Sequence, residues 1–289
     1  MRCIHKTVSR ICAKVFAQAG THLLTLSGWK RSTVESNLIH VYGTGKMSAD
    51  KRAAFYRQVI ENLTRHAGEI LFRFDEYKSL PQKLESYPCR RGRNLYEIAS
   101  GSAATIQKMR QGGIFLTAHY GNYEAMGPWL CRLGIPLKAS HIPLKPSCLN
   151  RFVEDKLRSV DGKSYAVNPK NPREFLRILD DGNLFCLLAD QDSRVPSATT
   201  GYFLGQNARM NPLPDFLLKH RPDTPVFACW IEEFHNMKVL HADELLAEGD
   251  GKIMEAFNRW LEMRIREQPE LWYGWTHRRF YSVSPDRYK

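Results

Sequence analysis

The sequence predicts an α/β fold in which helices flank a central, mostly parallel or mixed sheet. Three observations support this class. Between residues 95 and 232, short apolar runs alternate with stretches of helical periodicity. Two of the runs, residues 114–118 and 184–189, are almost entirely apolar, as expected of strands that are covered on both faces. Both runs end in polar residues, and the carboxyl ends of strands are where open α/β sheets bind their ligands.

The composition describes a basic globular chain. Its 289 residues carry a formal net charge of +12, which favours an anionic partner: a nucleic acid, an anionic membrane surface or a phosphorylated substrate. Seven cysteines without a Cys-x-x-Cys pair indicate neither a disulfide framework nor a zinc module, so we expect no metal and a reducing, cytoplasmic setting. No stretch approaches the roughly 18 apolar residues that span a bilayer, and no secretory signal is visible.

The first 34 residues contain no acidic side chain. On a helix, basic residues spaced by four would form one stripe and apolar residues the opposite one: Arg2, Lys6, Arg10 and Lys14 against Ile4, Val8, Ile11 and Val15. This segregation is typical of an amphipathic helix in a membrane interface. The alternative is an apolar stripe packed on the domain with a solvated basic face. We expect residues 1–34 to be a basic amphipathic membrane-interface segment and residues 35–289 to be a single α/β domain.

The next part of the chain is predicted to be helical. Residues 48–74 contain no proline and place apolar residues at helical spacing, which predicts a long helix that faces the core or lines a groove. Residues 95–110 are predicted to form a second helix, ended by Gly112 and Gly113. We expect both helices to pack on the α/β domain.

The first candidate site follows the strand predicted at residues 114–118. His119 comes directly after it, Gly121 and Asn122 supply turn and N-cap chemistry, and Glu124 lies at the start of a helix predicted over residues 125–133. A histidine here can act as a base, and a carboxylate five residues on can return across the turn to hold its ring. The alternative is a histidine with a purely structural hydrogen bond, which is common at such positions.

The alternation continues to a second polar cluster. Strands are predicted at residues 135–142, 163–167 and 184–189, with helices at residues 150–158 and 173–180. The last of these strands ends in Asp190 and Gln191. Residues 193–214 are rich in proline, serine, threonine and glycine and predict a long loop, which usually covers or binds a ligand.

The C-terminal part combines a hairpin, a helix and an aromatic, basic end. Strands at residues 226–232 and 237–241 are predicted to pair through His235 and Asn236, and residues 252–267 to form an amphipathic helix. Residues 271–280 are predicted either as an aromatic core strand with a solvated basic tail or as a contact for a phosphate-bearing ligand, through Arg278 and Arg279.

Three separated segments resemble one known family, the bacterial lipid A late acyltransferases (lauroyl/myristoyl transferases), which carry a His-x4-Glu motif. His119-Tyr-Gly-Asn-Tyr-Glu124 resembles the family's His-aromatic-Gly-Asn-Trp-Glu motif, Asp190-Gln191 its Asp-Gln, and Trp275-Thr-His-Arg-Arg-Phe280 its terminal signature. Arg158 occupies the place of a family arginine, although Lys145-Pro146-Ser147 replaces the usual Asn-Pro.

This resemblance implies a glycerolipid-acyltransferase-like fold and an O-acyltransferase of lipid A and lipopolysaccharide biosynthesis. The enzyme would move a fatty acyl chain from an acyl-carrier-protein or CoA thioester to a hydroxyl of a lipid A precursor, without a cofactor, on the cytoplasmic face of the inner membrane as a peripheral or monotopic protein. The implied roles are His119 and Glu124 as a general-base dyad, Arg158 or the backbone amides of Gly121 and Asn122 as oxyanion donors, Asp190 and Gln191 behind His119 or on the sugar, and Arg278 and Arg279 near lipid phosphates or the acidic carrier protein.

Other functions remain open on the sequence. A lysophospholipid or a mannosylated phosphoinositide would suit the motif equally well, because the motif specifies the chemistry and not the acceptor. A nucleic-acid-binding module rests on charge alone, and since no helix-turn-helix, zinc or RNA-binding signature is visible, we expect no nucleic-acid partner. A metallohydrolase with His119 and Glu124 as ligands lacks a His-Glu-x-x-His motif.

Overall fold

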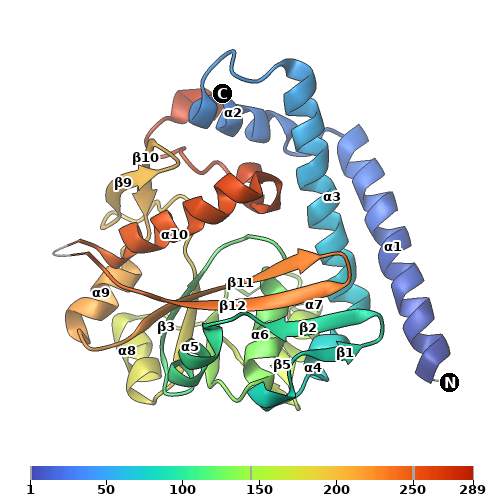
Figure 1. Cartoon of the computed structure of the whole chain (residues 1–289). Coiled ribbons are helices and arrows are strands. Elements are labelled where there is room, and N and C mark those ends of the chain that lie inside the picture. The colour runs from blue at the N-terminus through green and yellow to red at the C-terminus, as the bar shows by residue number, and fades with distance from the viewer. Residues whose placement is uncertain (1, 144, 249–250, 289) are drawn as a thin grey trace.

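The computed structural model describes residues 2–143, 145–248 and 251–288, with side chains described from residue 8 onward except at residue 149. An eight-stranded sheet lies at its centre, with helices on both faces (Figure 1). The strands of the sheet, in spatial order, are β1 (Cys89–Arg91), β2 (Asn94–Ile98), β12 (Met237–Leu245), β11 (Val226–Phe234), β3 (Gly113–Thr117), β8 (Leu184–Leu188), β4 (Leu137–Ser140) and β7 (Ala166–Val167).

The sheet is mixed and mostly parallel. Strand β3 pairs in parallel with β8 and β11, β4 pairs in parallel with β8 and β7, and β12 pairs in parallel with β2. The antiparallel pairs are the hairpins β1–β2 and β11–β12. The predicted α/β class with a central, mostly parallel or mixed sheet is therefore confirmed.

Strand β3 shows why the sheet is covered on both sides. All five of its residues are buried, and successive side chains of a strand point to opposite faces. Ile114 and Leu116 pack in one core together with Phe257 and Leu261, whereas Phe115 packs in the other core with Trp129. An apolar side chain at every position is therefore needed, which explains the continuous apolar run in the sequence.

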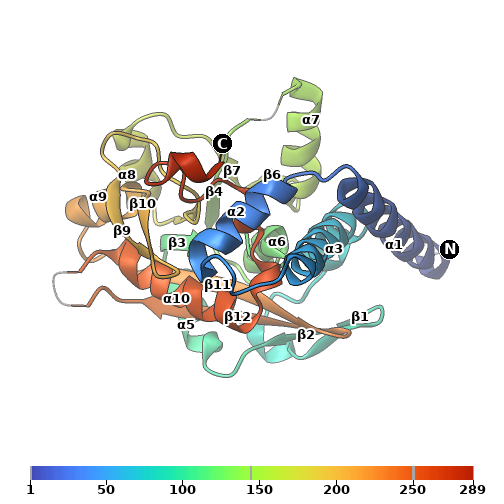
Figure 2. The same cartoon turned by 90° about the horizontal axis from the view of Figure 1, so that it is seen from above.

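The helices follow the predicted order. Ser48 caps α3 by accepting a hydrogen bond from the amide of Lys51 (3.3 Å), so the long helix expected at residues 48–74 is confirmed. Figure 2 shows α5 and α10 on opposite sides of the sheet. The helices are α1 (Arg2–Leu26), α2 (Arg31–Tyr42), α3 (Ala49–Arg73), α4 (Asp75–Lys78), α5 (Ser102–Met109), α6 (Tyr123–Arg132), α7 (Ser147–Phe152), α8 (Pro172–Asp180), α9 (Leu213–His220) and α10 (Ile253–Glu267).

Three predicted elements are wrong in part. The helix expected over residues 95–110 begins only at Ser102, because Asn94–Ile98 forms the strand β2, which pairs with β1 and β12. The loop expected over residues 193–214 contains a separate hairpin, β9 (Thr199–Phe203) with β10 (Gln206–Met210). The strand expected at residues 163–167 is split in two: β6 (Lys163–Ser164) pairs with β5 (Ser159–Val160), and only β7 joins the large sheet.

The N-terminal helix packs against the domain with its small and polar side. Ala13 is buried against α3, where a Cβ atom at Gly68 would come within 2.7 Å of the Ala13 carbonyl oxygen. The hydroxyls of Thr21 and Thr64 lie 2.7 Å apart. Such a contact places two helix backbones close together without burying large apolar side chains.

The predicted apolar stripe of α1 points away from the domain. Val8, Ile11 and Val15 are 52%, 57% and 57% exposed. The alternative in which this stripe packs on the domain is therefore wrong, because the helix faces the domain with its other side. The side chains of Arg2, Ile4 and Lys6, part of the predicted pattern, lie outside the described residues.

Helix α2 joins α1 to the rest of the molecule. The boundary expected at residue 34 falls inside α2, where Val34 and Leu38 are buried in the same core as Phe55 of α3. Among the described residues, no helix combines the length and the apolar character needed to cross a membrane.

Candidate active site

The site forms where two neighbouring parallel strands end. Strands β3 and β8 pair so that Thr117 lies opposite Leu188. His119 and Asp190 each follow two residues later, and they meet at the same edge of the sheet. His119 Nδ1 lies 2.8 Å from Asp190 Oδ1, and the His119 backbone amide donates to Asp190 Oδ2 at 3.1 Å.

Asp190 is a buried, ionised partner of this histidine. Its side chain is fully buried, and the indole Nε1 of Trp272 donates to Oδ2 at 2.9 Å. Burial alone would raise the pKa of Asp190, but the positive charge of His119 and the hydrogen bonds from His119 and Trp272 hold it at about 2. Burial likewise lowers the pKa of His119, and the charge and hydrogen bond of Asp190 outweigh this, so the pKa of His119 is raised.

The other ring nitrogen of His119 faces outward. Because the Asp190 carboxylate can only accept, Nδ1 carries the hydrogen and Nε2 has a free lone pair in the neutral ring. The side-chain nitrogen of Gln191 lies 3.5 Å from Nε2. The rings of Tyr123 and His277 flank the imidazole, with centroids 5.1 and 5.6 Å away. The side chain of His119 keeps 16% of its surface exposed, enough to contact a bound substrate.

The sequence predicts that Glu124 holds the ring of His119, and this prediction is wrong. Its Oε1 accepts from Arg158 Nη2 at 2.7 Å, and Asp190 occupies Nδ1 instead. Glu124 nevertheless contributes to the raised pKa of His119 through its charge. A small cavity of about 50 Å³ lies beside the Glu124–Arg158 pair, lined by apolar side chains that include Leu137 and Leu188.

In the loop after His119, the Gly121 amide, one of the two predicted oxyanion donors, is already engaged. Gly121 has a φ of 55°, and its amide donates to the Leu271 carbonyl at 2.9 Å. The side chain of Asn122 is buried and points away from His119 into a polar cluster, where it donates to Glu69, Tyr77 and Glu233. The Gly121 amide and the Asn122 side chain therefore hold the loop in place.

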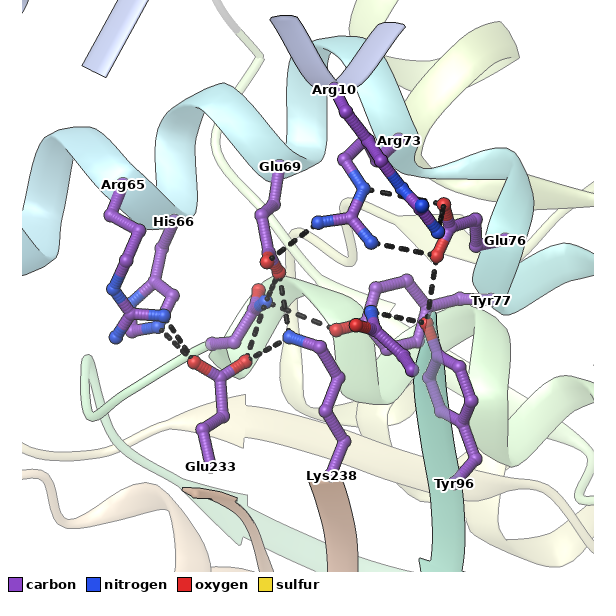
Figure 3. Close-up of polar contacts among 12 residues, drawn as sticks. Arg10, Arg65, His66, Glu69, Arg73, Glu76, Tyr77, Tyr96, Glu233 and Lys238 are labelled. Carbon is purple, nitrogen blue, oxygen red and sulfur yellow. Dashed lines mark hydrogen bonds and ion pairs between the residues drawn. The ribbon is translucent and has the colours of Figure 1, made fainter. Parts of the chain in front are cut away.

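This polar cluster, shown in Figure 3, was not predicted. Lys238 of β12 lies between two carboxylates, 2.7 Å from Glu69 Oε2 of α3 and in contact with Glu233 of β11. The same Glu233 accepts from His66 Nε2 (2.8 Å) and from Arg65. Burial lowers the pKa of His66. The spacing of His66, Glu69 and Arg73 places these three polar residues on one side of the predicted helix, and this pattern could have indicated a polar cluster.

The two C-terminal arginines lie in different environments. Arg278 is exposed and stacks on Tyr281, 5.7 Å from the ring centroid. Arg279 is 1% exposed, donates to the Arg209 carbonyl at 2.9 Å and lies 5.0 Å from the centroid of Phe203. Burial lowers the pKa of Arg279 to about 10. The sequence predicts that Arg279 contacts a lipid phosphate or the carrier protein. Because its side chain is buried, the structure does not present it to either partner.

The residues around this pair take the form of short turns and not the predicted aromatic strand. Residues Tyr273–Thr276 form a 3-10 turn, and the Tyr273 amide donates to the His119 carbonyl at 2.7 Å. Trp272 was not singled out from the sequence, although its place in the aromatic run next to the terminal signature could have indicated it. Among the described residues, no group of three or more His, Cys, Asp or Glu side chains is arranged to hold a metal ion.

These features define an α/β protein with a histidine–carboxylate pair at the carboxyl edge of its sheet and an arginine–carboxylate pair beside it. The chain belongs to the bacterial lipid A biosynthesis acyltransferase family, whose model matches residues 1–282. Membership makes the protein an O-acyltransferase with a lipid acceptor and an acyl donor. A search of curated proteins gave no match.

Proposed function

We propose that this protein transfers a fatty acyl chain from an acyl-carrier-protein thioester to a hydroxyl of a lipid A precursor, with His119 as the general base. Besides the family, one observation carries the proposal: Asp190 engages Nδ1 of His119 and leaves Nε2 facing outward as a proton acceptor. The raised pKa of His119 makes its ring a stronger base, which suits a histidine that must take a proton and later release it.

The reaction follows from this geometry. Nε2 of His119 removes the proton from the acceptor hydroxyl as its oxygen attacks the thioester carbonyl. The tetrahedral intermediate collapses with cleavage of the carbon–sulfur bond, which yields the ester and the carrier thiolate, and the proton returns from the imidazolium to the thiolate. Asp190 stabilises the imidazolium while it exists and keeps the ring in the productive tautomer. No acyl-enzyme is needed.

The tetrahedral oxyanion requires a donor, for which we propose Arg158. Its Nη2 is held by Glu124 at 2.7 Å, and its guanidinium has further N–H groups to offer. Glu124 then acts on the reaction through two routes, by aiming Arg158 and by adding negative charge near His119. This role replaces that of direct ring holder in the predicted dyad.

We further propose that helix α1 attaches the enzyme peripherally to the cytoplasmic face of the inner membrane. The exposed side chains of Val8, Ile11, Val15 and Leu26 supply an apolar stripe, and the absence of acidic residues before Glu35 suits an anionic surface. Peripheral attachment would bring the site to its lipid acceptor while leaving it open to a carrier protein in the cytoplasm.

An acyl-transfer assay tests the proposal. Acyl-carrier-protein donors of several chain lengths would be mixed with a Kdo-bearing tetra-acylated lipid A precursor, and products would be read by mass spectrometry. Wild type should add one acyl chain, His119→Ala should abolish transfer, and the control His220→Ala, at an exposed histidine of α9, should keep it. His119-dependent transfer to a lysophospholipid or mannolipid but not to the precursor would assign a different acceptor. Equal activity of His119→Ala and wild type would overturn the base assignment.

A further inference from the structure

A groove runs between α1 and α3, and we name it the α1–α3 groove. It encloses about 670 Å³ and is lined by Arg10, Ala13, Lys14, Ala17, Gln18, Thr21, His22, Thr25, Leu26, Arg57, Glu61, Arg65, Glu69 and Arg73. Figure 1 shows the two helices running side by side along one flank of the molecule. The groove is large enough to admit a small polar group.

The charge of this groove is not balanced. Five arginine and lysine side chains line it, against the two carboxylates of Glu61 and Glu69. Glu69 is already engaged by Lys238 and Arg73. The groove therefore has an excess of positive charge that its own carboxylates do not neutralise.

Two of the cations make no ion pair with any described residue, and a third makes only a long one. Within the described residues, Lys14 and Arg57 make no ion pair, although they face the groove from opposite helices. Arg10 Nη2 is buried and lies 3.9 Å from Glu76 Oε1, a distance that allows an ion pair but no hydrogen bond. That atom lies against Glu76 and Gly92, so Lys14 and Arg57 are the groove cations that have no counter-charge among the described residues. Arginine and lysine donors from two sides are a typical setting for phosphate.

The groove opens next to the exposed apolar stripe of α1. Lys14 is adjacent in sequence to Val15 and lies three residues after Ile11, so the cation and the apolar side chains are on neighbouring sides of one helix. If the stripe enters the apolar part of a bilayer, the groove lies at the depth of the lipid head groups. A phosphate held there would come from a membrane lipid.

We propose that the α1–α3 groove binds the phosphate group of an anionic glycerophospholipid. This site is distinct from His119 and does not depend on which lipid is acylated. Arg10 and Lys14 from α1 and Arg57 from α3 contact the phosphate, while the apolar stripe enters the acyl region of the same leaflet. The bound lipid thus bridges two helices that already approach each other closely at Ala13 and Gly68.

Vesicle flotation tests this proposal with the full-length protein. Vesicles of phosphatidylcholine alone would be compared with vesicles that also contain phosphatidylglycerol. The groove variant Lys14→Gln/Arg57→Gln removes two cations that make no ion pair. The control variant Lys46→Gln/Lys51→Gln removes the same charge from exposed positions at the start of α3, outside the groove. Since a basic residue near an anionic surface contributes about 1 kcal/mol, the groove variant should bind phosphatidylglycerol vesicles about thirtyfold more weakly, and the control less than about threefold.

The outcomes separate a lipid site from simpler explanations. Equal losses in the groove and control variants would mean that net charge alone attracts the protein, and no loss in either would mean that the groove binds no lipid; both overturn the proposal. A third arm adds inorganic phosphate and follows the melting temperature. If phosphate raises the melting temperature of wild type but not of the groove variant, while both bind vesicles equally, the groove is a site for free phosphate and the lipid assignment is wrong.

Discussion

Asp190 holds His119 twice, once through the ring and once through the backbone. Its Oδ1 lies 2.8 Å from Nδ1 of the imidazole, and its Oδ2 accepts the His119 amide at 3.1 Å. Because one carboxylate makes both contacts, the ring cannot rotate without breaking a bond to the residue that also fixes its main chain. The histidine is therefore oriented before any substrate binds, as an effective general base requires.

Asp190→Asn is expected to lower kcat by about ten-thousandfold, on the scale found when a buried carboxylate behind a histidine base is neutralised. Wild-type activity should rise with pH through an apparent pKa above 6.5, because Asp190 raises the pKa of His119 and the base works when neutral. In the variant this apparent pKa should fall. A pH–rate profile of both proteins checks the shift, and identical profiles would show that Asp190 does not act on the histidine.

The same pair makes stability depend on pH. The pKa of Asp190 is about 2 in the folded protein, below its ordinary value, so its contribution is present above about pH 4 and is lost as the pH falls toward 2. The pKa of His119 is raised, so its contribution is fully present below pH 6.5 and is lost as the pH rises through the raised value. Thermal melts across this range should show a loss at both ends that is smaller in Asp190→Asn.

Trp272→Phe should uncouple the indole from the carboxylate. The change removes a hydrogen bond to a charged group, which contributes about 1.5–3 kcal/mol, and it should raise the pKa of Asp190. Trp275→Phe is a matched control, since that indole is equally buried and donates to the Pro269 carbonyl at 2.8 Å. Both variants should unfold at lower denaturant concentration, and only Trp272→Phe should shift the pH–rate profile. A shifted pH–rate profile in both variants would mean that a general loss of stability, and not the lost hydrogen bond to Asp190, causes the shift.

The sequence predicted the position of the site better than its internal contacts. The strand–turn–helix pattern around His119 and the polar end of β8 were recognised because both are local. The choice of partner was not local, since Asp190 is 71 residues away and only the register of β3 against β8 brings it to the ring. Glu124 was nearer in sequence, and periodicity carries no information on which carboxylate a ring nitrogen meets.

The missed strand β2 has a similar explanation. Leu95 and Ile98 fit a helical pattern that continues into α5, whereas the strand exists because β1 and β12 pair with it on either side. Periodicity also could not predict that the apolar stripe of α1 points outward. It separates the two faces of a helix but does not say which face packs on the protein. The close approach of Ala13 to Gly68 decides it.

A double-mutant cycle distinguishes the two routes proposed for Glu124. Glu124→Gln and Arg158→Gln should each lower kcat/KM, and the double variant should lose little more than the worse single variant, with a coupling of about 1 kcal/mol or more. This follows if Glu124 works mainly by holding Arg158. Strictly additive losses, with a lower apparent pKa of His119 in both Glu124→Gln backgrounds, would instead return Glu124 to the predicted dyad with His119.

Lys238→Met should destabilise the fold strongly. The ammonium is 6% exposed and neutralises Glu69 and Glu233, so its removal leaves buried carboxylates without their closest counter-charge, a loss of about 3–5 kcal/mol. Arg221→Met is the control, because it breaks an exposed pair with Asp180 and should change the free energy of unfolding little. Urea titrations measure both. Similar small effects would mean that other groups of the cluster replace the lysine.

Ile11→Ser/Val15→Ser should weaken vesicle binding without weakening the fold. Both side chains are 57% exposed, so their loss removes apolar area available to a bilayer and costs the folded protein little. Binding to phosphatidylcholine vesicles should fall about tenfold or more at an unchanged melting temperature. Ile142→Ser/Leu246→Ser, at exposed positions of 86% and 74% off α1, should leave both quantities unchanged. A lower melting temperature for the α1 variant would mean that the stripe packs on protein.

The orientation of α1 also has a practical consequence for handling the purified protein. Away from a bilayer, the stripe of Val8, Ile11, Val15 and Leu26 is left facing water, and the cheapest way to cover it is a second copy or a detergent micelle. Self-association in plain buffer should therefore increase with concentration, and a mild detergent should return the monomer. The aggregation state of a preparation would then report how well α1 is covered, and activity measured without an amphiphile would reflect a mixture of accessible and occluded molecules.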